Sequence, residues 1–551
     1  MSTHVASGPH LATPEEAERY VAEGWWSTEG LVAVLDRHAS ERPDGTAWIG
    51  DGFACTWAQV RTASTVVASV LQAHGVSRGT RVAVLLADSP IVHAVYLGVE
   101  RAGAVVVGIG PRAGRREVEH ILSVTAAELL IAPLRFRDHD LGAFVGELSA
   151  ALPLRELIEL DGDGLVATLD GRSLFAPDAL PVVDPAVRRR PDELFLLNST
   201  SGTTGLPKVV MHTANRWRAF HRMAAEAGEL TAADVFMSVI PAPYGFGIWT
   251  AHVTPLLLGA PCVVLERFTA EAMLEAIERH RVTVLAAVST QFIMALNAES
   301  LGSHQLSTLR ALFTGGEAVP YERAARFEEV TGARVLQFFG SNETGALSVT
   351  TTRDTPEQRL RTAGRVIPVM NVRLFADDGR DITDTGGPGR PACRGPVTCL
   401  GYLGDPAATE ELVRPDGWML TGDIVVVDAD GYLSVVGRTS DFVIRGGKNI
   451  SAPAVEEAVG GAPGVAMVAA VAAPSPVFGE RVCVYVVPAP GATVTLSGIN
   501  DHLAASDVSK EAWPELLVLV DALPMSSGGK VAKGDLRADV RRRIEAGELN
   551  G

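Results

Sequence analysis

The sequence predicts an α/β protein in which a large N-terminal part is built on parallel sheets and a small α+β part follows. The chain has 551 residues, which is too long for one ordinary hydrophobic core. Up to about residue 370, short apolar runs alternate with segments of helical spacing, and shorter, turn-rich segments follow. Hydrophobic residues make up 47% of the chain and charged residues 21%, which is a globular composition.

The alternation of helix and strand patterns begins near residue 56. Apolar residues have helical spacing at 57–74 and 91–102, and a continuous apolar run follows each of these segments, at 81–86 and 104–109. Continuous apolar runs indicate strands that are buried on both faces, as in a parallel sheet. Further strands are predicted at 194–197, 260–265, 282–288, 311–314 and 335–338, and a further helix at 269–280.

The segment 235–265 contains no Asp, Glu, Lys or Arg and therefore resembles a membrane span in composition. Pro241, Pro243, Pro255 and Pro261 interrupt it, however, and a spanning helix does not tolerate so many breaks. We therefore predict a buried strand, a loop and a helix in this segment.

From about residue 372, glycine, aspartate and proline turns multiply, which favours short antiparallel strands. We predict a small β-barrel-like subdomain there. The domain boundary is predicted near residue 437, which gives an N-terminal domain of residues 1–437 and a C-terminal domain of residues 438–551. In the second domain we predict a helix at 454–459, strands at 466–472 and 481–487, and then a short tail.

Charge and cysteine content exclude several classes of protein. The net charge is −17 and the sequence has no basic stripe, so binding to nucleic acid is not expected. The five cysteines are scattered and odd in number, which indicates a reducing compartment and neither a disulfide framework nor a zinc site. The N-terminus has no basic region followed by an apolar core, so we expect no secretory signal and a cytoplasmic location.

A loop rich in serine, threonine and glycine follows the strand predicted at 194–197. Its sequence from residue 199 to 208 is STSGTTGLPK. Gly202 and Gly205 permit positive φ, and consecutive N–H groups in such a loop form an anion-binding concavity. Lys208 adds a positive charge, so phosphate is the expected ligand. A flexible linker has the same composition, so the loop alone leaves both interpretations open.

The loop is not a Walker phosphate loop. Pro207 stands where that motif needs glycine before the lysine, and Val209 stands where it needs serine or threonine.

Five segments are similar, in their order and spacing, to motifs of the adenylate-forming superfamily, which includes acyl- and aryl-CoA synthetases. The resemblance covers the chain from about Trp26 to Arg537. It implies a reaction in two halves, in which a carboxylate attacks the α-phosphate of ATP and a thiol then attacks the acyl-adenylate. The five segments are TSGTTGLPK (200–208), FFGSNETG (338–345), WMLTGD (418–423), GRTSDFVIRGGKNI (437–450) and LPMSSGGK (523–530).

The resemblance also implies a role for individual residues around the nucleotide. Glu343 is the implied Mg²⁺ ligand, Asp423 and Arg438 bind the ribose, and Phe339 frames the adenine. Asn342 stands where the family usually has threonine, and an asparagine can still donate a hydrogen bond to a phosphate oxygen. The implied ATP- and AMP-binding set is Thr200, Ser201, Gly202, Thr203, Thr204, Gly205, Gly316, Glu317, Ala318, Phe339, Gly340, Ser341, Asn342, Asp423 and Arg438.

Lys530 is the implied catalytic lysine, which bridges the substrate carboxylate and the α-phosphate, and Lys208 and Glu343 complete the catalytic set. Asp441 is the implied hinge of a mobile C-terminal domain. The C-terminal domain rotates about this hinge between the half-reactions, and the rotation brings the Gly446–Gly447 edge to the tunnel for the thiol. Lys533, in contrast, is expected to be a surface lysine.

The stretch PAPYGFGIW (241–249) occupies the region that forms the acid pocket in the family. It lacks the aspartate with which amino-acid-activating relatives pair an ammonium group, so an amine-bearing substrate would leave a buried unpaired charge. Aromatic residues in this stretch favour a flat or bulky apolar acid, which leaves benzoate-like, naphthoate-like, alicyclic and medium-chain acids open. The lead-in RYVAEGWW (19–26) resembles that of aryl-acid and cyclohexanecarboxylate ligases, which favours a ring. The predicted acid pocket comprises Tyr244, Phe246, Gly247, Trp249 and Gly315.

The expected activity is that of an AMP-forming acid–thiol ligase that uses ATP and Mg²⁺ and transfers an aryl or alicyclic acyl group to CoA. A stand-alone adenylation enzyme that loads a carrier protein's phosphopantetheine is the alternative. Arg445 and Lys448 favour CoA, because CoA carries phosphates that a carrier protein lacks. A non-catalytic nucleotide-binding protein is a remote alternative, and the presence of Lys530, Glu343 and Asp423 argues against it.

Overall fold

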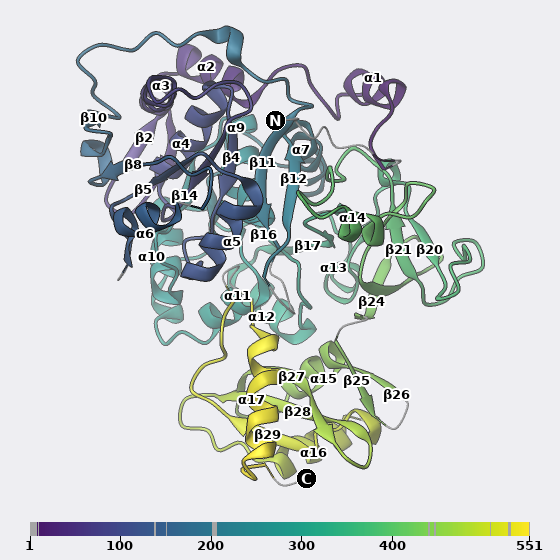
Figure 1. Ribbon diagram of the computed structural model, residues 1–551. Helices are drawn as coiled ribbons and strands as arrows, with labels where there is room; N and C mark the ends of the chain where they lie inside the picture. The colour runs from purple at the N-terminus through teal and green to yellow at the C-terminus, as the bar shows by residue number, and fades with distance from the viewer. Residues whose placement is uncertain are drawn as a thin grey trace.

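The computed structural model describes residues 8, 10–136, 139–149, 151–200, 206–438, 441–445, 448–506, 508–526 and 530–549. A large N-terminal part carries layers of helices and sheets, and a small C-terminal part lies beneath it, next to α11 (Ser289–Leu296) and α12 (Tyr321–Thr331) in Figure 1. The predicted α/β class and the division into a large and a small part are confirmed.

One large sheet carries the predicted strands of residues 260–338. Strands β17, β16, β15, β13, β14 and β1 lie side by side in this order and run parallel, and antiparallel strands extend both edges. The strands are β1 (Thr46–Ile49), β2 (Ala54–Thr56), β13 (Phe236–Ser238), β14 (Cys262–Val264), β15 (Val284–Ala286), β16 (Ala311–Gly315), β17 (Arg334–Ser341), β18 (Gly345–Val349) and β19 (Arg365–Val366).

A second large sheet carries the earlier strands in the order β10, β9, β8, β5, β3, β4, β11 and β12. The strands from β8 to β11 are parallel, and β12 closes one edge as the antiparallel partner of β11. The strands are β3 (Arg81–Val84), β4 (Val105–Gly108), β5 (Leu129–Ala132), β8 (Glu156–Asp161), β9 (Thr168–Leu169), β10 (Arg172–Ser173), β11 (Leu194–Ser199) and β12 (Val209–Thr213), and a ribbon of β6 (Arg135–Phe136) and β7 (His139–Asp140) lies apart.

Helices of the N-terminal part cover these sheets. The helix predicted at 57–74 is α3, and Thr56 caps its N-terminus. The Thr56 side chain accepts a hydrogen bond from the Gln59 backbone N–H, and the Gln59 side chain accepts one from the Thr56 backbone N–H. The helices are α1 (Pro14–Ala22), α2 (Leu31–Glu41), α3 (Trp57–Ala73), α4 (Pro90–Arg101), α5 (Arg115–Thr125), α6 (Leu141–Leu148), α7 (Ala214–Gly228), α8 (Gly245–Gly247), α9 (Thr254–Leu258), α10 (Ala270–His280), α11 (Ser289–Leu296), α12 (Tyr321–Thr331), α13 (Pro356–Arg361) and α14 (Pro406–Leu412).

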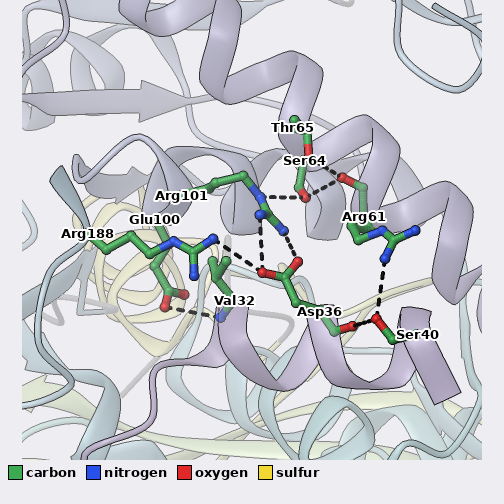
Figure 2. Close-up of polar contacts among 9 residues, drawn as sticks. All are labelled: Val32, Asp36, Ser40, Arg61, Ser64, Thr65, Glu100, Arg101 and Arg188. Carbon is green, nitrogen blue, oxygen red and sulfur yellow. Dashed lines mark hydrogen bonds and ion pairs between the residues drawn. The ribbon is translucent and has the colours of Figure 1, made fainter. Parts of the chain in front are cut away.

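A polar cluster ties α2, α3 and α4 together (Figure 2). The Arg101 guanidinium lies 2.6 Å from an Asp36 carboxylate oxygen and donates to the Ser64 hydroxyl. Glu100, beside it on α4, accepts a hydrogen bond from the Val32 N–H in the first turn of α2. That helix has no side-chain cap of its own, so Glu100 satisfies one of its free N–H groups. Burial raises the pKa of Glu100 to about 7.

The uncharged segment 235–265 folds as predicted, into β13, a loop, short helices and β14. Between α8 and α9 the chain forms a π-helix, Ile248–Val253, of which every residue is buried. Within the described residues, no helix combines the length and the apolar character that crossing a membrane requires.

The predicted short antiparallel strands after residue 372 are present. They form a small sheet of β20 (Arg373–Phe375), β21 (Arg390–Cys393) and β22 (Met419–Leu420), and a ribbon of β23 (Asp423–Val427) and β24 (Leu433–Arg438). A bridge between Gly389 and Val425 joins the two.

The C-terminal part has a sheet and hydrophobic clusters of its own. The predicted helix and strands are α15, β27 and β28, but the prediction of a short tail after them is wrong, because residues 488–549 include two helices and a strand. One of these helices, α17, packs against β27, and the strand β29 pairs with β28. The elements are β25 (Phe442–Arg445), β26 (Lys448–Ser451), α15 (Ala452–Gly460), β27 (Val465–Ser475), β28 (Gly479–Pro488), α16 (Leu496–Ala505), β29 (Leu516–Leu519) and α17 (Lys533–Glu545).

Candidate active site

Several of the predicted site residues follow the carboxyl ends of neighbouring parallel strands. Ser238 at the end of β13 lies opposite Ala286 of β15, and Gly315 at the end of β16 lies opposite Phe338 of β17. The loops after these strands carry residues 241–249, 316–318 and 342–344. Parallel sheets bind ligands at this edge, so the topology brings the predicted acid pocket and nucleotide residues to one place.

The threonine-rich loop joins β11 to the antiparallel β12. Ser199 lies opposite Val209, and the Thr200 N–H donates to the Lys208 carbonyl over 3.0 Å, so the two ends of the loop are held together. The predicted phosphate contacts of Ser201, Gly202, Thr203, Thr204 and Gly205 lie outside the described residues. The Lys208 ammonium lies 4.9 Å from the centre of the Tyr402 ring, which is a cation–π distance.

Tyr402 connects two of the predicted catalytic residues. Its hydroxyl donates to Oε1 of Glu343 over 2.6 Å, while its ring faces Lys208. Burial, and then the Glu343 carboxylate, raise the pKa of Tyr402 far above its usual value, so the hydroxyl keeps its proton. Tyr402 is 59 residues from Glu343, and nothing in the sequence around it indicates this contact.

A buried hydrogen-bonded chain supports the turn that carries Asn342 and Glu343. Asn198, the penultimate residue of β11, donates to the Pro243 carbonyl over 2.9 Å and accepts from the Asn342 amide over 2.8 Å. His212 of β12 also donates to Asn198, over 2.7 Å. The chain therefore joins the acid-pocket loop to the Glu343 turn.

Arg216, near the start of α7, ends this chain. Its guanidinium bonds to His212 Nδ1 and to the backbone carbonyls of Val397 and Glu343. Burial, followed by the Arg216 charge, keeps the pKa of His212 well below its usual value, so the imidazole is neutral and accepts at Nδ1. Burial also lowers the pKa of Arg216, to about 10. We therefore assign Arg216, His212 and Asn198 a positioning role that the sequence did not reveal.

Lys530 reaches the predicted nucleotide site from the C-terminal part. Its ammonium donates to the Gly316 carbonyl over 2.7 Å, although 214 residues separate the two. Gly316 has φ +77°, and a Cβ there would lie 2.8 Å from the Lys530 nitrogen, so glycine allows both the turn and the approach of the lysine.

Glu317 lies beside this contact and binds a backbone N–H in the first turn of α11. It accepts a hydrogen bond from the Thr290 N–H over 3.0 Å, in the first turn of α11. Burial raises the pKa of Glu317, and the positive charge of Lys530 opposes this shift. Ala318, next in the loop, accepts from the Ser289 hydroxyl. The loop that is predicted to frame adenine is thus fixed to α11.

The two residues predicted to bind ribose lie opposite each other. Asp423 begins β23 and lies opposite Arg438, the last residue of β24, in the antiparallel register of the two strands. The Asp423 N–H donates to the Thr421 hydroxyl, and Thr421 is buried. Phe339, predicted to frame adenine, is buried in β17 and pairs with Ser348 of β18. Gly340 and Ser341 follow it in the same strand, and the Ser341 hydroxyl accepts from the Glu343 N–H.

The predicted acid-pocket residues divide into two layers. Tyr244 and Phe246 pack with Ile240 and Val288 in a small cluster at the sheet edge. Trp249 lies deeper, is 1% exposed, and packs against other rings. Its neighbours are Phe246 at 5.4 Å, Phe338 at 4.5 Å, Phe220 at 4.7 Å and Phe313 at 5.6 Å between ring centres. Phe338, Phe220 and Phe313 were not among the predicted pocket residues.

Gly247 and Gly315 also lie at this edge, and both are close to neighbouring backbone. A Cβ at Gly247 would come within 2.1 Å of the Pro241 carbonyl oxygen, and one at Gly315 within 2.5 Å of the Phe338 carbonyl oxygen. Any larger residue at either position would therefore displace the loop or the strand.

The predicted hinge residue is bound to the last helix. Asp441 Oδ1 lies 2.6 Å from an Arg537 guanidinium nitrogen of α17. Gly446 and Gly447, the predicted tunnel edge, lie outside the described residues. The expectation that Lys533 is a surface lysine is wrong, because its ammonium lies 2.8 Å from a carboxylate oxygen of Glu456 of α15, and both side chains are part-buried.

The described residues contain no group of three or more His, Cys, Asp or Glu side chains that is suited to a metal ion. Mg²⁺ that is bound together with phosphates needs only one or two protein carboxylates. Glu343 fits that role, because Tyr402 bonds to Oε1 and no hydrogen bond to Oε2 is made by the described residues.

The chain matches one family over most of its length. Residues 35–403 match the family described as AMP-binding enzyme, and residues 454–530 match the AMP-binding enzyme C-terminal domain. The chain belongs to the AMP-binding enzyme family. This AMP-binding enzyme is an acid–thiol ligase of the acyl- and aryl-CoA synthetase type, as the adenylate-forming motifs predicted.

Relatives of this AMP-binding enzyme match it over nearly their whole length. It is 30% identical over 530 residues to the medium-chain fatty-acid–CoA ligase of Escherichia coli (strain K12), with 95% of this chain and 93% of that protein covered. It is 32% identical over 544 residues to the salicylyl-CoA synthase / salicylate adenylyltransferase of a Streptomyces species, with 97% and 98% covered. Its fold matches the crystal structure of an anthranilate CoA ligase in complex with anthranoyl-AMP, with a TM-score of 0.83, 23% identity, and 94% and 98% covered.

Proposed function

We propose that this enzyme activates an aryl or alicyclic carboxylic acid with ATP and then transfers the acyl group to CoA, releasing AMP and pyrophosphate. The contact between Lys530 and the Gly316 carbonyl carries this proposal. It puts a cation from the C-terminal part next to the loop that follows β16, where an acid from one side and a nucleotide from the other can meet. A cation there neutralises charge as two anions approach each other.

The other residues have supporting roles in the proposal. Lys208 and the loop 200–205 bind the phosphates, Asp423 and Arg438 bind the ribose, and Phe339 and residues 316–318 border the adenine. The Asn342 amide donates one N–H to Asn198, so its second N–H is the donor left for the predicted phosphate contact. Mg²⁺, held by Glu343, supplies positive charge at the phosphates when it is bound.

Aromatic side chains at the sheet edge support the choice of acid. Tyr244 and Phe246 form the layer that can contact a substrate, and Trp249 and Phe338 support it from behind. These groups are apolar and flat, which suits a ring. The relatives include a salicylyl-CoA synthase, which is named for an aryl acid, and a medium-chain fatty-acid–CoA ligase, which is named for a flexible one.

The choice of CoA as the thiol acceptor is supported by the relatives more than by the charges near the proposed tunnel. Arg445 and Lys448, which favoured CoA, are each paired, Arg445 with Glu515 and Lys448 with Glu511. A carrier-protein phosphopantetheine therefore stays the alternative acceptor.

We also propose the domain boundary at residues 437–438, with Asp441 as the hinge and Gly446–Gly447 as the tunnel edge. Two core clusters that lie wholly within the C-terminal part support an independent domain. The contacts across the boundary include the backbone carbonyls of Gly460 and Val465, which accept from Arg323 of α12. Such contacts can be broken and remade when a domain rotates.

Pyrophosphate release tests the proposal. The purified enzyme is given ATP, Mg²⁺ and either benzoate, salicylate, cyclohexanecarboxylate or octanoate, with and without CoA. We expect release with a ring acid, faster release when CoA is added, and an acyl-CoA product by mass spectrometry. Release without a CoA product would favour the carrier-protein alternative, a preference for octanoate would refute the acid class, and no release with any acid would refute adenylation.

A further inference from the structure

A cavity of about 580 Å³, largely open to solvent, lies between the segment that follows α1 and the outer face of α7. Trp26 and Ser27 form one wall, and Arg218, His221 and Arg222 form the other. Residues 218, 221, 222 and 225 recur at helical spacing, so one face of α7 lines the cavity. The volume lies in the range of small-molecule sites. The proposed reaction uses none of these residues.

The first wall is held in place by hydrogen bonds to the core of the protein. The Trp26 indole N–H donates to the Pro396 carbonyl over 3.0 Å, and the Ser27 N–H donates to the Asn215 side chain over 2.9 Å. The Arg222 guanidinium lies 4.0 Å from the centre of the Trp25 ring. The cavity is therefore bounded by fixed groups on both sides.

Arg218 is the unusual group in this cavity. It is part-buried, and burial lowers its pKa. It donates to the Glu29 backbone carbonyl over 2.8 Å, but no carboxylate of the described residues lies within ion-pair distance of it. The Glu29 and Glu100 carboxylates favour its charged form from beyond ion-pair distance. A bound anion in direct contact would offset more of the cost of desolvation.

The remaining groups leave the cavity positive. Arg222 pairs with Glu226, which also lines the cavity, at 2.9 Å. Burial lowers the pKa of His221 to about 4, so this ring is neutral at pH 7. Its Nδ1 lies 3.3 Å from the Thr254 hydroxyl, and no bond to Nε2 is made by the described part of the chain. Two guanidiniums face one carboxylate, so the lining carries one net positive charge.

We propose that this cavity binds a small organic anion through a carboxylate or phosphate group. Arg218 supplies the charge, His221 Nε2 supplies a neutral hydrogen-bonding group, and the Trp26 wall accommodates the apolar part. The site is separate from the proposed acid and nucleotide sites, which lie on the other side of α7 and at the sheet edge. Guanidinium groups pair with carboxylates and phosphates alike, so the two sources are distinguished by experiment.

Isothermal titration of the full-length protein with phenyl phosphate and with phenylacetate tests the proposal. We expect at least one probe to bind at millimolar or lower concentration, and its affinity to fall at least 10-fold in Arg218→Gln, because a charge-assisted bond is lost. Arg218→Lys keeps the charge and is expected to lose less. Arg326→Gln, which removes an exposed arginine of α12, is the matched control and should bind as wild type does.

Equal affinity of wild type and Arg218→Gln for both probes would overturn the proposal, as would no binding of either probe. Phenylacetate that binds equally to both proteins occupies another site, such as the acid pocket. If Arg218→Gln does not fold, a crystal structure of wild type grown with phenyl phosphate decides. Density against Arg218 and His221 supports the proposal, and density confined to the nucleotide site overturns it.

Discussion

Replacing Tyr402 by Phe removes one hydroxyl from the candidate active site and keeps the ring. The ring still faces Lys208 at a cation–π distance, so the lysine loses nothing directly. What is lost is the 2.6 Å hydrogen bond to Glu343. Hydrogen bonds to a charged partner contribute about 1.5–3 kcal/mol. The side chain is part-buried, so we take the lower end, which corresponds to about a 10-fold change in an equilibrium constant.

We expect this loss to appear in the Mg²⁺ requirement, because Glu343 is the proposed Mg²⁺ ligand and the bond restricts its orientation. The assay is pyrophosphate release as a function of Mg²⁺ at fixed ATP. The half-maximal Mg²⁺ concentration should rise about 10-fold, and the rate at saturating Mg²⁺ should fall less. Tyr432→Phe removes a similar 2.7 Å bond, to Asp354, and is the matched control. An unchanged Mg²⁺ requirement in a folded Tyr402→Phe protein would refute the reasoning.

Three further predictions follow from other contacts. Lys530→Ala should slow adenylation at least 100-fold and spare thioester formation from supplied acyl-adenylate, with Lys510→Ala as a surface control; loss of both half-reactions would contradict the assigned role. Asn198→Ala leaves several buried groups without a partner and should lower the free energy of unfolding by about 3 kcal/mol in urea denaturation, and a change below about 1 kcal/mol would show that the chain relaxes around the gap. Glu100 has a pKa raised from 4.5 to about 7 in the folded state, so the folded protein holds a proton that the unfolded chain releases. The free energy of unfolding should therefore fall by about 3 kcal/mol as the pH rises from about 4.5 to 7. In Glu100→Gln, denaturation at pH 5 and pH 8 should show a smaller difference in stability than in wild type.

The sequence predicted the fold and the meeting of distant motifs better than it predicted the supporting contacts. Apolar runs placed β16 and β17, and motif order led us to expect Lys530 beside the nucleotide loops. Tyr402 and Arg216 were missed because each acts through a partner that is remote in the chain, and neither has a distinctive local pattern. Such contacts become visible only when the strands are placed.

The error in the C-terminal tail has a different cause. Helix α17 is highly charged, and only Leu536 and Val540 are buried in it, so its apolar periodicity is weak. Its stability comes from packing on β27 and not from a strong stripe of its own. Lys533 at its start was expected to be exposed for the same reason, since the facing Glu456 belongs to another element.

Helix α7 has consequences for any attempt to alter acid preference. Arg216 contacts the turn below Glu343, Phe220 packs on Trp249, and Arg218 lines the separate cavity. These three side chains therefore tie the helix to three different parts of the molecule. Engineering libraries are better spent on residues 240–246 than on these helix positions, where an exchange removes a contact with another part of the molecule.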